Sequence, residues 1–183
     1  MKTESYSSMP RGLVPNSRFP ILVYRDAGPH DQHAMTQMFR QHGWLNNWQY
    51  PGIYPYGHFH STTHESLGCA VGWMEIEVFG EGGETLRLEA GDVLIMPAGV
   101  SHNMTGHSDD VLVVGGYPLG REWDNVPDAS LNEERRRAAV KRIMMLPIPD
   151  GNPVNGEPIT EWIEAPSSVD AGWNEFRDAL DEY

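Results

Sequence analysis

Two glycine-bounded segments, residues 52–72 and 91–106, constrain the fold of this chain more than any other feature of its sequence. Both carry side chains of types that bind metal ions, and these are His58, His60, Glu65 and His102. Successive side chains of an extended strand alternate between faces, so His58 and His60 project to the same side, with Cα atoms about 7 Å apart. Two imidazoles can therefore reach one ion, which predicts strands that meet at a metal site.

Glu65 lies at an odd offset from His60 and would face the other way in an unbroken strand. We therefore expect a turn or bulge within residues 61–64, after which Glu65 opens the next strand. Two histidines and one carboxylate leave room for a further ligand, and His102 has to arrive from a third strand. The predicted metal ligands are His58, His60, Glu65 and His102.

These two segments resemble the paired motifs of the cupin superfamily. The first has every spacing of the motif that runs from Gly52 to Gly72, and the second departs only at Gly106, where many cupins have asparagine. The stretches HFHSTTHE, GDVLIMPAGVSH and GGYPLGREWD are similar to the small single-domain bacterial cupins of the YjlB type. The resemblance covers roughly residues 40–165. It implies a double-stranded β-helix, a jelly-roll barrel, which holds one divalent ion through three histidines and one glutamate.

The expected fold class is mainly β, with a few peripheral helices around the barrel. The 183 residues are suited to one domain with a sizeable core. Within it we expect an arm, an edge strand and a helix over residues 1–43, the barrel core with the metal motifs over 44–120, and a C-terminal helix with a proline-rich surface segment over 121–183.

Local patterns predict several elements outside the metal motifs. Residues 1–16 are polar with interspersed proline and glycine, which favours an arm rather than core. Residues 19–24 form an apolar strand candidate, and Pro20 favours an edge position for it. Residues 31–42 have apolar side chains at helical spacing, and Gly43 follows as a stop signal.

Later patterns extend this prediction. Alternating apolar and acidic residues over 73–78 indicate a half-buried strand. Ser130 and Glu133 have the spacing of a capping box, which predicts a helix of about 12 to 14 residues. Residues 173–183 could form a short terminal helix.

Composition narrows the range of partners. A formal net charge of −13 and a pI near 4.9 argue against nucleic acid and anionic membrane surfaces, because both would repel the chain. The single cysteine, Cys69, excludes an internal disulfide and favours a reducing compartment, and we expect it to be a buried, inert thiol. The N-terminal residues lack the apolar run of a signal peptide, which favours a cytoplasmic location. The expected partners are a small-molecule substrate and, because cupins are commonly dimers, a second copy of the chain.

Six further residues are candidates for substrate binding: Trp48, Tyr50, Tyr56, His64, Tyr117 and Arg121. His64 competes with Glu65 as a ligand, because a histidine four residues after His60 would complete a zinc-binding pair on a helix. The β-branched Thr62 and Thr63 argue against a helix there, so we place His64 behind the ligands or at the cavity rim.

For the other candidates, a structural role such as packing or a surface salt bridge is an alternative to substrate binding. Trp48, Tyr50 and Tyr56 precede the first histidine strand, where they line the cavity mouth or contribute to packing. Tyr117 and Arg121 follow a core strand, and Arg121 could hold a substrate carboxylate. An exposed salt bridge is the simpler account of that arginine.

The ligand set favours a metal-dependent enzyme acting on a small molecule. Four protein ligands around an ion that prefers six leave two adjacent positions open, which suits a chelating substrate or one oxygen plus dioxygen. With Fe2+, the favoured ion, this predicts dioxygenase-like chemistry, whereas Mn2+, Ni2+ or Zn2+ could act as a Lewis acid in a lyase or isomerase on a hydroxy- or sugar-acid. A third reading is a ligand-binding or sensory module whose metal docks an effector.

Overall fold

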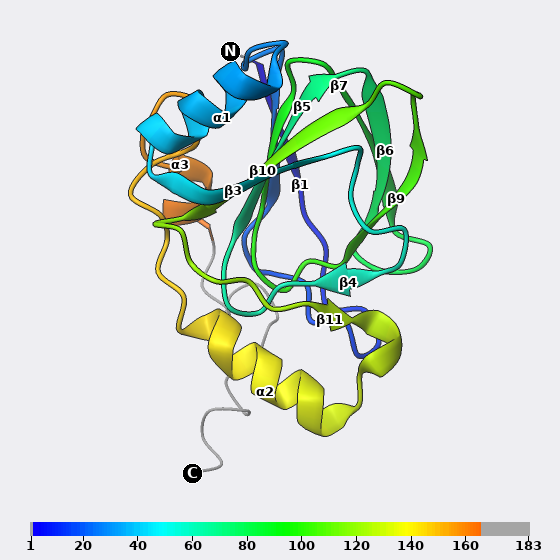
Figure 1. Ribbon diagram of the computed structural model, residues 1–183. Helices are drawn as coiled ribbons and strands as arrows, with labels where there is room; N and C mark the ends of the chain where they lie inside the picture. The colour runs from blue at the N-terminus through cyan, green and yellow to red at the C-terminus, as the bar shows by residue number, and fades with distance from the viewer. Residues whose placement is uncertain (1, 166–183) are drawn as a thin grey trace.

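The computed structural model describes residues 2–165, which form two antiparallel β-sheets with helices packed around them (Figure 1). The six-stranded sheet has the order β1 (Lys2–Tyr6), β2 (Ile21–Arg25), β8 (Val93–Met96), β5 (Glu65–Val71), β10 (Leu112–Pro118) and β3 (Trp44–Tyr50). The five-stranded sheet has the order β11 (Val126–Pro127), β4 (His58–Phe59), β9 (His102–His107), β6 (Trp73–Val78) and β7 (Glu84–Glu89). The helices are α1 (Gln32–Gln41), a 3-10 helix (Asp128–Ser130), α2 (Glu133–Met144) and α3 (Thr160–Ile163). The expected mainly β jelly-roll fold is confirmed, since the chain passes repeatedly from one sheet to the other.

Apolar side chains from both sheets fill the space between them. In β6 the predicted alternation is confirmed, because Met74, Ile76 and Val78 are buried in this core while the residues between them are half-buried. Slipping β6 by one residue would expose all three, so this pattern sets its register. Cys69 lies in the same core, so the expected burial of its thiol is confirmed, and this burial raises the pKa of the thiol to about 12.

The outer face of the six-stranded sheet is covered by α1 and by residues 148–165, so its central strands are buried on both sides (Figure 1). The predicted helix is confirmed: Asp31 caps α1 by accepting a hydrogen bond from the Ala34 amide at 2.8 Å, and Met35 and Phe39 face the sheet. Gly43 follows the helix with φ of +76°, a conformation that glycine adopts without strain.

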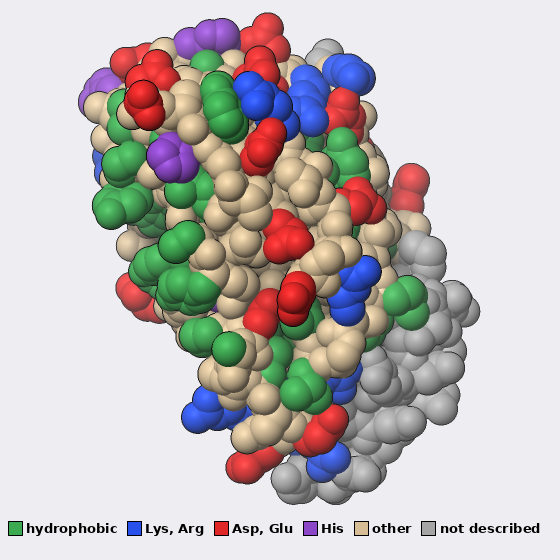
Figure 2. Space-filling model, turned by 90° about the vertical axis from the view of Figure 1, so that its right-hand side faces the viewer, with side chains coloured by type: hydrophobic (Ala, Val, Ile, Leu, Met, Phe, Trp, Pro, Cys, Tyr) green, Lys and Arg blue, Asp and Glu red, His purple; other side chains and the backbone are tan. Residues whose placement is uncertain are grey.

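The five-stranded sheet, by contrast, faces outward with charged side chains. In Figure 2, which views the molecule from the side of β6 and β9, acidic and basic side chains are interspersed without a continuous basic area on the described part of this face. Arg87 of β7 illustrates the pattern, because it pairs with Glu89 at 3.0 Å and lies over the Trp73 ring. This sheet therefore buries one face only.

Two predictions for the N-terminal region are wrong. The expected arm contains β1, which pairs with β2 along its whole length, and Glu4 forms an ion pair with Arg25 at 2.7 Å. A polar segment fits here because β1 is the sheet edge, where side chains can face solvent while the backbone pairs. The strand β2 is not an edge, since it pairs with both β1 and β8. Pro20 directly precedes β2, so its missing N–H leaves the ladder intact.

The capping box predicted for the C-terminal helix is also wrong, although the helix itself is confirmed with 12 residues. Asn132 caps α2 by accepting a hydrogen bond from the Arg135 amide at 2.9 Å. Ser130 ends the preceding 3-10 helix and donates its hydroxyl to the Pro127 carbonyl. The helix expected over residues 173–183 lies outside the described residues. None of the helices within residues 2–165 combines the length and apolarity needed to cross a membrane.

Candidate metal centre

Four side chains from the two sheets converge at one end of the space between them: His58, His60, Glu65 and His102. His58 lies in β4 opposite His102 in β9, and His60 follows β4 directly. The chain bends at residues 61–62 before Glu65 opens β5, which is the interruption that the odd spacing predicted. One ring nitrogen from each histidine lies within 4.8 Å of those of the other two.

The outward-facing nitrogen of each histidine is held by a main-chain carbonyl. The Nδ1 atoms of His58 and His102 donate to the carbonyls of Tyr56 and Val100, each at 3.0 Å, and His60 Nδ1 donates to the carbonyl of Asp124. A carbonyl oxygen only accepts, so the proton resides on Nδ1 and the neutral ring presents its Nε2 lone pair inward. Three such lone pairs at one point are the arrangement that a metal ion requires.

Glu65 supplies the fourth inward-facing atom. Its Oε1 accepts a hydrogen bond from the Tyr117 hydroxyl at 2.9 Å, whereas its buried Oε2 has no hydrogen-bond partner among the described residues. Oε2 lies 3.3 Å from His60 Nε2 and 3.4 Å from His102 Nε2. A buried carboxylate oxygen beside two nitrogen lone pairs needs a positive charge between them, which either a divalent ion or a proton on an imidazole supplies.

The pKa values show which imidazole takes that proton in the absence of an ion. Burial, together with neighbouring His102, lowers the pKa of His58 to about 3. Burial also opposes the charged form of His60, but the Glu65 carboxylate outweighs it and raises the pKa of His60 above its ordinary value. For Glu65, burial disfavours the carboxylate, yet His60 and His102 together lower its pKa. The acidic group is therefore ionised at neutral pH, as a metal ligand has to be.

Asp124 anchors the loop that carries His60, and the sequence patterns did not point to it. In addition to its main-chain contact with His60, its carboxylate accepts hydrogen bonds from the amides of Ser61 and Thr62 at 2.6 and 3.1 Å. Burial acts against the ionised form, but hydrogen bonds from the Ser61 hydroxyl and from these two amides lower the pKa of Asp124. Arg142 of α2 extends the network by donating to the Ser61 hydroxyl at 2.8 Å.

The four inward-facing atoms lie at the base of a cavity of about 540 Å³. Its walls include Trp48, Tyr50 and Tyr117, three of the residues that the sequence suggested. They also include residues that sequence reasoning missed, chiefly Asn46, Asn47, Gln49, Ile53, Tyr54 and Trp123. The period-2 alternation of β3 could have indicated some of these, but Trp123 enters from a loop beyond β10 and has no local signal. Its ring lies 5.5 Å from that of His60.

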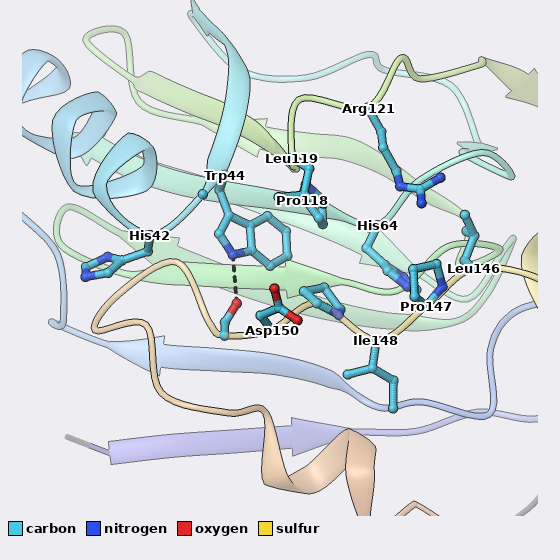
Figure 3. A pocket seen from close by; sticks show the side chains of 13 residues that line it. His42, Trp44, His64, Pro118, Leu119, Arg121, Leu146, Pro147, Ile148 and Asp150 are labelled. Atoms are coloured by element: carbon cyan, nitrogen blue, oxygen red, sulfur yellow. Dashed lines mark hydrogen bonds between the residues drawn. The ribbon is translucent and has the colours of Figure 1, made fainter.

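Three of the suggested residues lie elsewhere. The Tyr56 ring packs against His58 at 5.4 Å, but it is not among the residues that line the cavity, and its hydroxyl accepts a hydrogen bond from Asn125. His64 and Arg121 line a separate cavity on the other side of the six-stranded sheet (Figure 3). The reason is the strand period: His64 directly precedes Glu65 and so faces the opposite way.

Comparison with known proteins gives one sequence relative of substantial identity. YjlB, an uncharacterized protein of Bacillus subtilis (strain 168), is 35% identical over 167 residues, which cover 89% of this chain and 98% of YjlB. No protein-family model matches the chain.

Solved structures are similar to parts of the chain at much lower identity. WlaRB TDP-quinovose 3,4-ketoisomerase from Campylobacter jejuni is 14% identical with a TM-score of 0.40, over 50% of this chain and 72% of that one. Acireductone dioxygenase from Bacillus anthracis, with a cadmium ion in its active centre, is 17% identical with a TM-score of 0.37, over 49% of this chain and 59% of that one. A variant of Bacillus subtilis oxalate decarboxylase is 18% identical with a TM-score of 0.38, over 72% of this chain and 34% of that one.

Proposed function

The chain belongs to the cupins of the YjlB type, and on this premise we propose that it is a metal-dependent enzyme acting on a small molecule, as an Fe2+ dioxygenase. One observation carries the proposal. The Nε2 atoms of His58, His60 and His102 and the unpartnered Oε2 of Glu65 face one another at the base of a cavity large enough for a substrate.

The donor set fits a divalent ion. Three neutral imidazoles and one carboxylate would hold it, and a metal that prefers six ligands would keep two positions for substrate. When bound, such an ion supplies Lewis acidity toward a chelating substrate and, if it is redox-active like Fe2+, a route for electrons from substrate to dioxygen. The carboxylate also lowers the net charge of the site, which a dication needs in a buried place.

The cavity walls favour a neutral, planar substrate. Trp48, Tyr54 and Trp123 present aromatic rings, and no lysine or arginine is among the described residues that line the cavity. A substrate with several negative charges would lack partners here. An aromatic or enolic compound with two adjacent oxygens fits better, because its ring packs on the walls while its oxygens face the four ligands.

Tyr117 positions Glu65 and does not exchange protons at neutral pH. Burial and the adjacent Glu65 carboxylate raise the pKa of its hydroxyl well above the ordinary tyrosine value. The hydroxyl therefore stays protonated, donates to Glu65 Oε1 and accepts from Trp48 Nε1 at 2.8 Å. These contacts leave Glu65 Oε2 directed at His60 and His102.

Oxygen dependence tests the reaction class. A dioxygenation inserts both atoms of O2 into the substrate and takes all the electrons from it, so it needs no further reductant. The chain loaded with Fe2+ should turn over catechol-like and enediol substrates in air, with oxygen consumed in proportion to product, and should be inactive under anaerobic conditions. Turnover indifferent to oxygen would remove the dioxygenase assignment.

Two variants of β9 test whether turnover depends on the bound metal. His102→Ala should abolish both metal binding and turnover, whereas His107→Ala should retain both, because His107 is exposed at the other end of the strand. Equal turnover in these two variants would contradict a metal-dependent reaction. Activity with Zn2+ or Mn2+ in the absence of oxygen would instead support a lyase or isomerase. Metal-dependent stabilisation without turnover of any compound would support a sensory module.

A further inference from the structure

A second cavity lies on the outer side of the six-stranded sheet, behind the strand that carries Glu65 (Figure 3). It has a volume of about 180 Å³ and is enclosed by the start of β3, the loop after β10, and the segment 146–151 that follows α2. The Trp44 indole donates to the Gly151 carbonyl at 3.0 Å and fixes this segment against the sheet. None of the residues that line it also lines the cavity over the candidate metal centre, so the two are separate binding places.

His64 presents an unsatisfied donor to this cavity. Its side chain is 3% exposed, and its Nδ1 accepts a hydrogen bond from the Ala98 amide at 3.0 Å. The ring proton of the neutral imidazole must therefore be on Nε2, which has no hydrogen-bond partner among the described residues. The Pro147 carbonyl lies near the imidazole and favours its charged form, but it does not have the alignment of a hydrogen bond to Nε2. Buried N–H groups are rarely left unpaired, so this donor indicates a missing acceptor.

Arg121 supplies a positive charge beside that donor. Its side chain lines the cavity, and Figure 3 shows the guanidinium group extending toward the His64 imidazole. Within residues 2–165 no carboxylate forms an ion pair with it, unlike Arg25 or Arg142. A guanidinium and an imidazole N–H that converge on one place match the two oxygens of a carboxylate.

The other residues that line this cavity indicate which ligand would fit beside its charged end. Trp44, Leu146 and Ile148 give the cavity an apolar interior next to the charged end. Asp150, which also lines the cavity, lies at the end near Trp44 and away from Arg121, where it would repel a second negative charge (Figure 3). The site therefore selects against dianions and inorganic phosphate.

We propose that this cavity binds a small monocarboxylic acid, with the carboxylate held by Arg121 and His64 Nε2 and the apolar part against Trp44 and segment 146–151. The bound acid is not the substrate of the metal centre, because the two cavities are separate. It contacts the residue next to Glu65, which suits an effector. The inference does not depend on the proposed function.

Calorimetric titration of the full chain with butyrate tests this proposal. Butyrate should bind saturably, while butyramide, which has the same shape without the charge, and inorganic phosphate should each bind at least about 10-fold more weakly. Arg121→Gln should weaken butyrate binding by about 10-fold or more, because it removes a charge-assisted pair of hydrogen bonds. Arg135→Gln is the matched control: it removes an exposed arginine from the first turn of α2 and should leave the affinity unchanged.

A cavity-filling variant provides an independent check. Leu146→Trp places a larger side chain in the cavity and should abolish butyrate binding while circular dichroism and the unfolding temperature show an intact fold. Equal affinity for butyrate in the wild type and Arg121→Gln would overturn the proposal, since it would place the acid elsewhere, including at the metal centre. Equal affinity for butyrate and butyramide, or tighter binding of phosphate, would overturn the assignment to a monocarboxylate.

Discussion

Replacing Tyr117 with phenylalanine removes one hydroxyl group from the candidate metal centre and leaves every proposed ligand in place. That hydroxyl donates to Glu65 Oε1 at 2.9 Å and accepts from Trp48 Nε1 at 2.8 Å, and the side chain is almost fully buried. Without it, Oε1 loses its only side-chain donor among the described residues, and the carboxylate is free to rotate away from the histidines.

The size of the effect follows from these contacts. A hydrogen bond to a charged group contributes about 1.5–3 kcal/mol. Because each 1.4 kcal/mol is about a factor of ten in affinity, Tyr117→Phe should weaken the binding of a divalent ion by about 10- to 100-fold, the range typical for groups that orient a metal ligand. The lost partner of Trp48 adds little, because that indole lines the cavity and can donate to water.

Calorimetric titration with Zn2+ in competition with a chelator measures this change. Tyr6→Phe is the matched control, since the Tyr6 hydroxyl also donates to a carboxylate at 2.9 Å, that of Glu4 in the edge strand β1, which is three strands away from β5. The control should bind Zn2+ as the wild type does. If both variants bind Zn2+ with wild-type affinity, Glu65 is not a ligand held by Tyr117, and the reasoning about the fourth ligand is refuted.

Three further predictions concern the loop that carries His60, the hydrophobic core, and the competition between protons and metal at the histidines. Asp124→Ala should weaken Zn2+ binding by about 10-fold or more in the same titration, because the amides that hold the His60 loop lose their acceptor; wild-type affinity would contradict this role. Ile76→Ala should lower the free energy of unfolding in urea by about 2–5 kcal/mol without changing metal stoichiometry, and a loss below about 1 kcal/mol would contradict its place in the core. Metal affinity should fall as the pH drops from about 8 to about 6, because the raised pKa of His60 makes protons compete there, whereas His58 with its pKa near 3 does not compete; constant affinity over this range would contradict the assignment.

In the metal-free protein, the raised pKa of His60 also affects how the stability of the fold depends on pH. The His60–Glu65 ion pair stabilises the fold fully below the ordinary histidine pKa, and this contribution is lost as the pH rises through the raised value. The lowered pKa values of His58 and His64 act in the opposite direction on the wild type, so the comparison with a variant isolates the ion pair. The loss of stability to urea caused by Glu65→Gln in the metal-free protein should be larger at about pH 6 than at about pH 8.

The candidate ligands could be predicted from the sequence because each lies on a short segment whose spacing reflects strand geometry. Alternation brings His58 and His60 together, and the odd offset of Glu65 required the bend that the structure has. Local composition gave a wrong prediction where pairing between distant strands determines the structure. The polar segment 1–16 contains β1 because an edge strand tolerates polar side chains on an otherwise buried sheet.

Residues that support the site could not be predicted, because their positions depend on how the chain returns after β10. Asp124 holds the His60 loop from a segment far along the chain, and no periodicity or motif marks it. For Arg121 a position after a core strand was expected, but which of two cavities this exposed residue faces depends on the turn after β10. His64 could have been assigned from strand alternation alone, since a residue adjacent to Glu65 must face the other side.

Anomalous X-ray diffraction from crystals of the Zn2+-loaded protein tests the central claim most directly, because it locates the ion without reference to activity. We predict one strong peak per chain, about 2.0–2.2 Å from the Nε2 atoms of His58, His60 and His102 and from Oε2 of Glu65. A loaded crystal with no peak among these four side chains, or with its only peak at another place, would contradict the account.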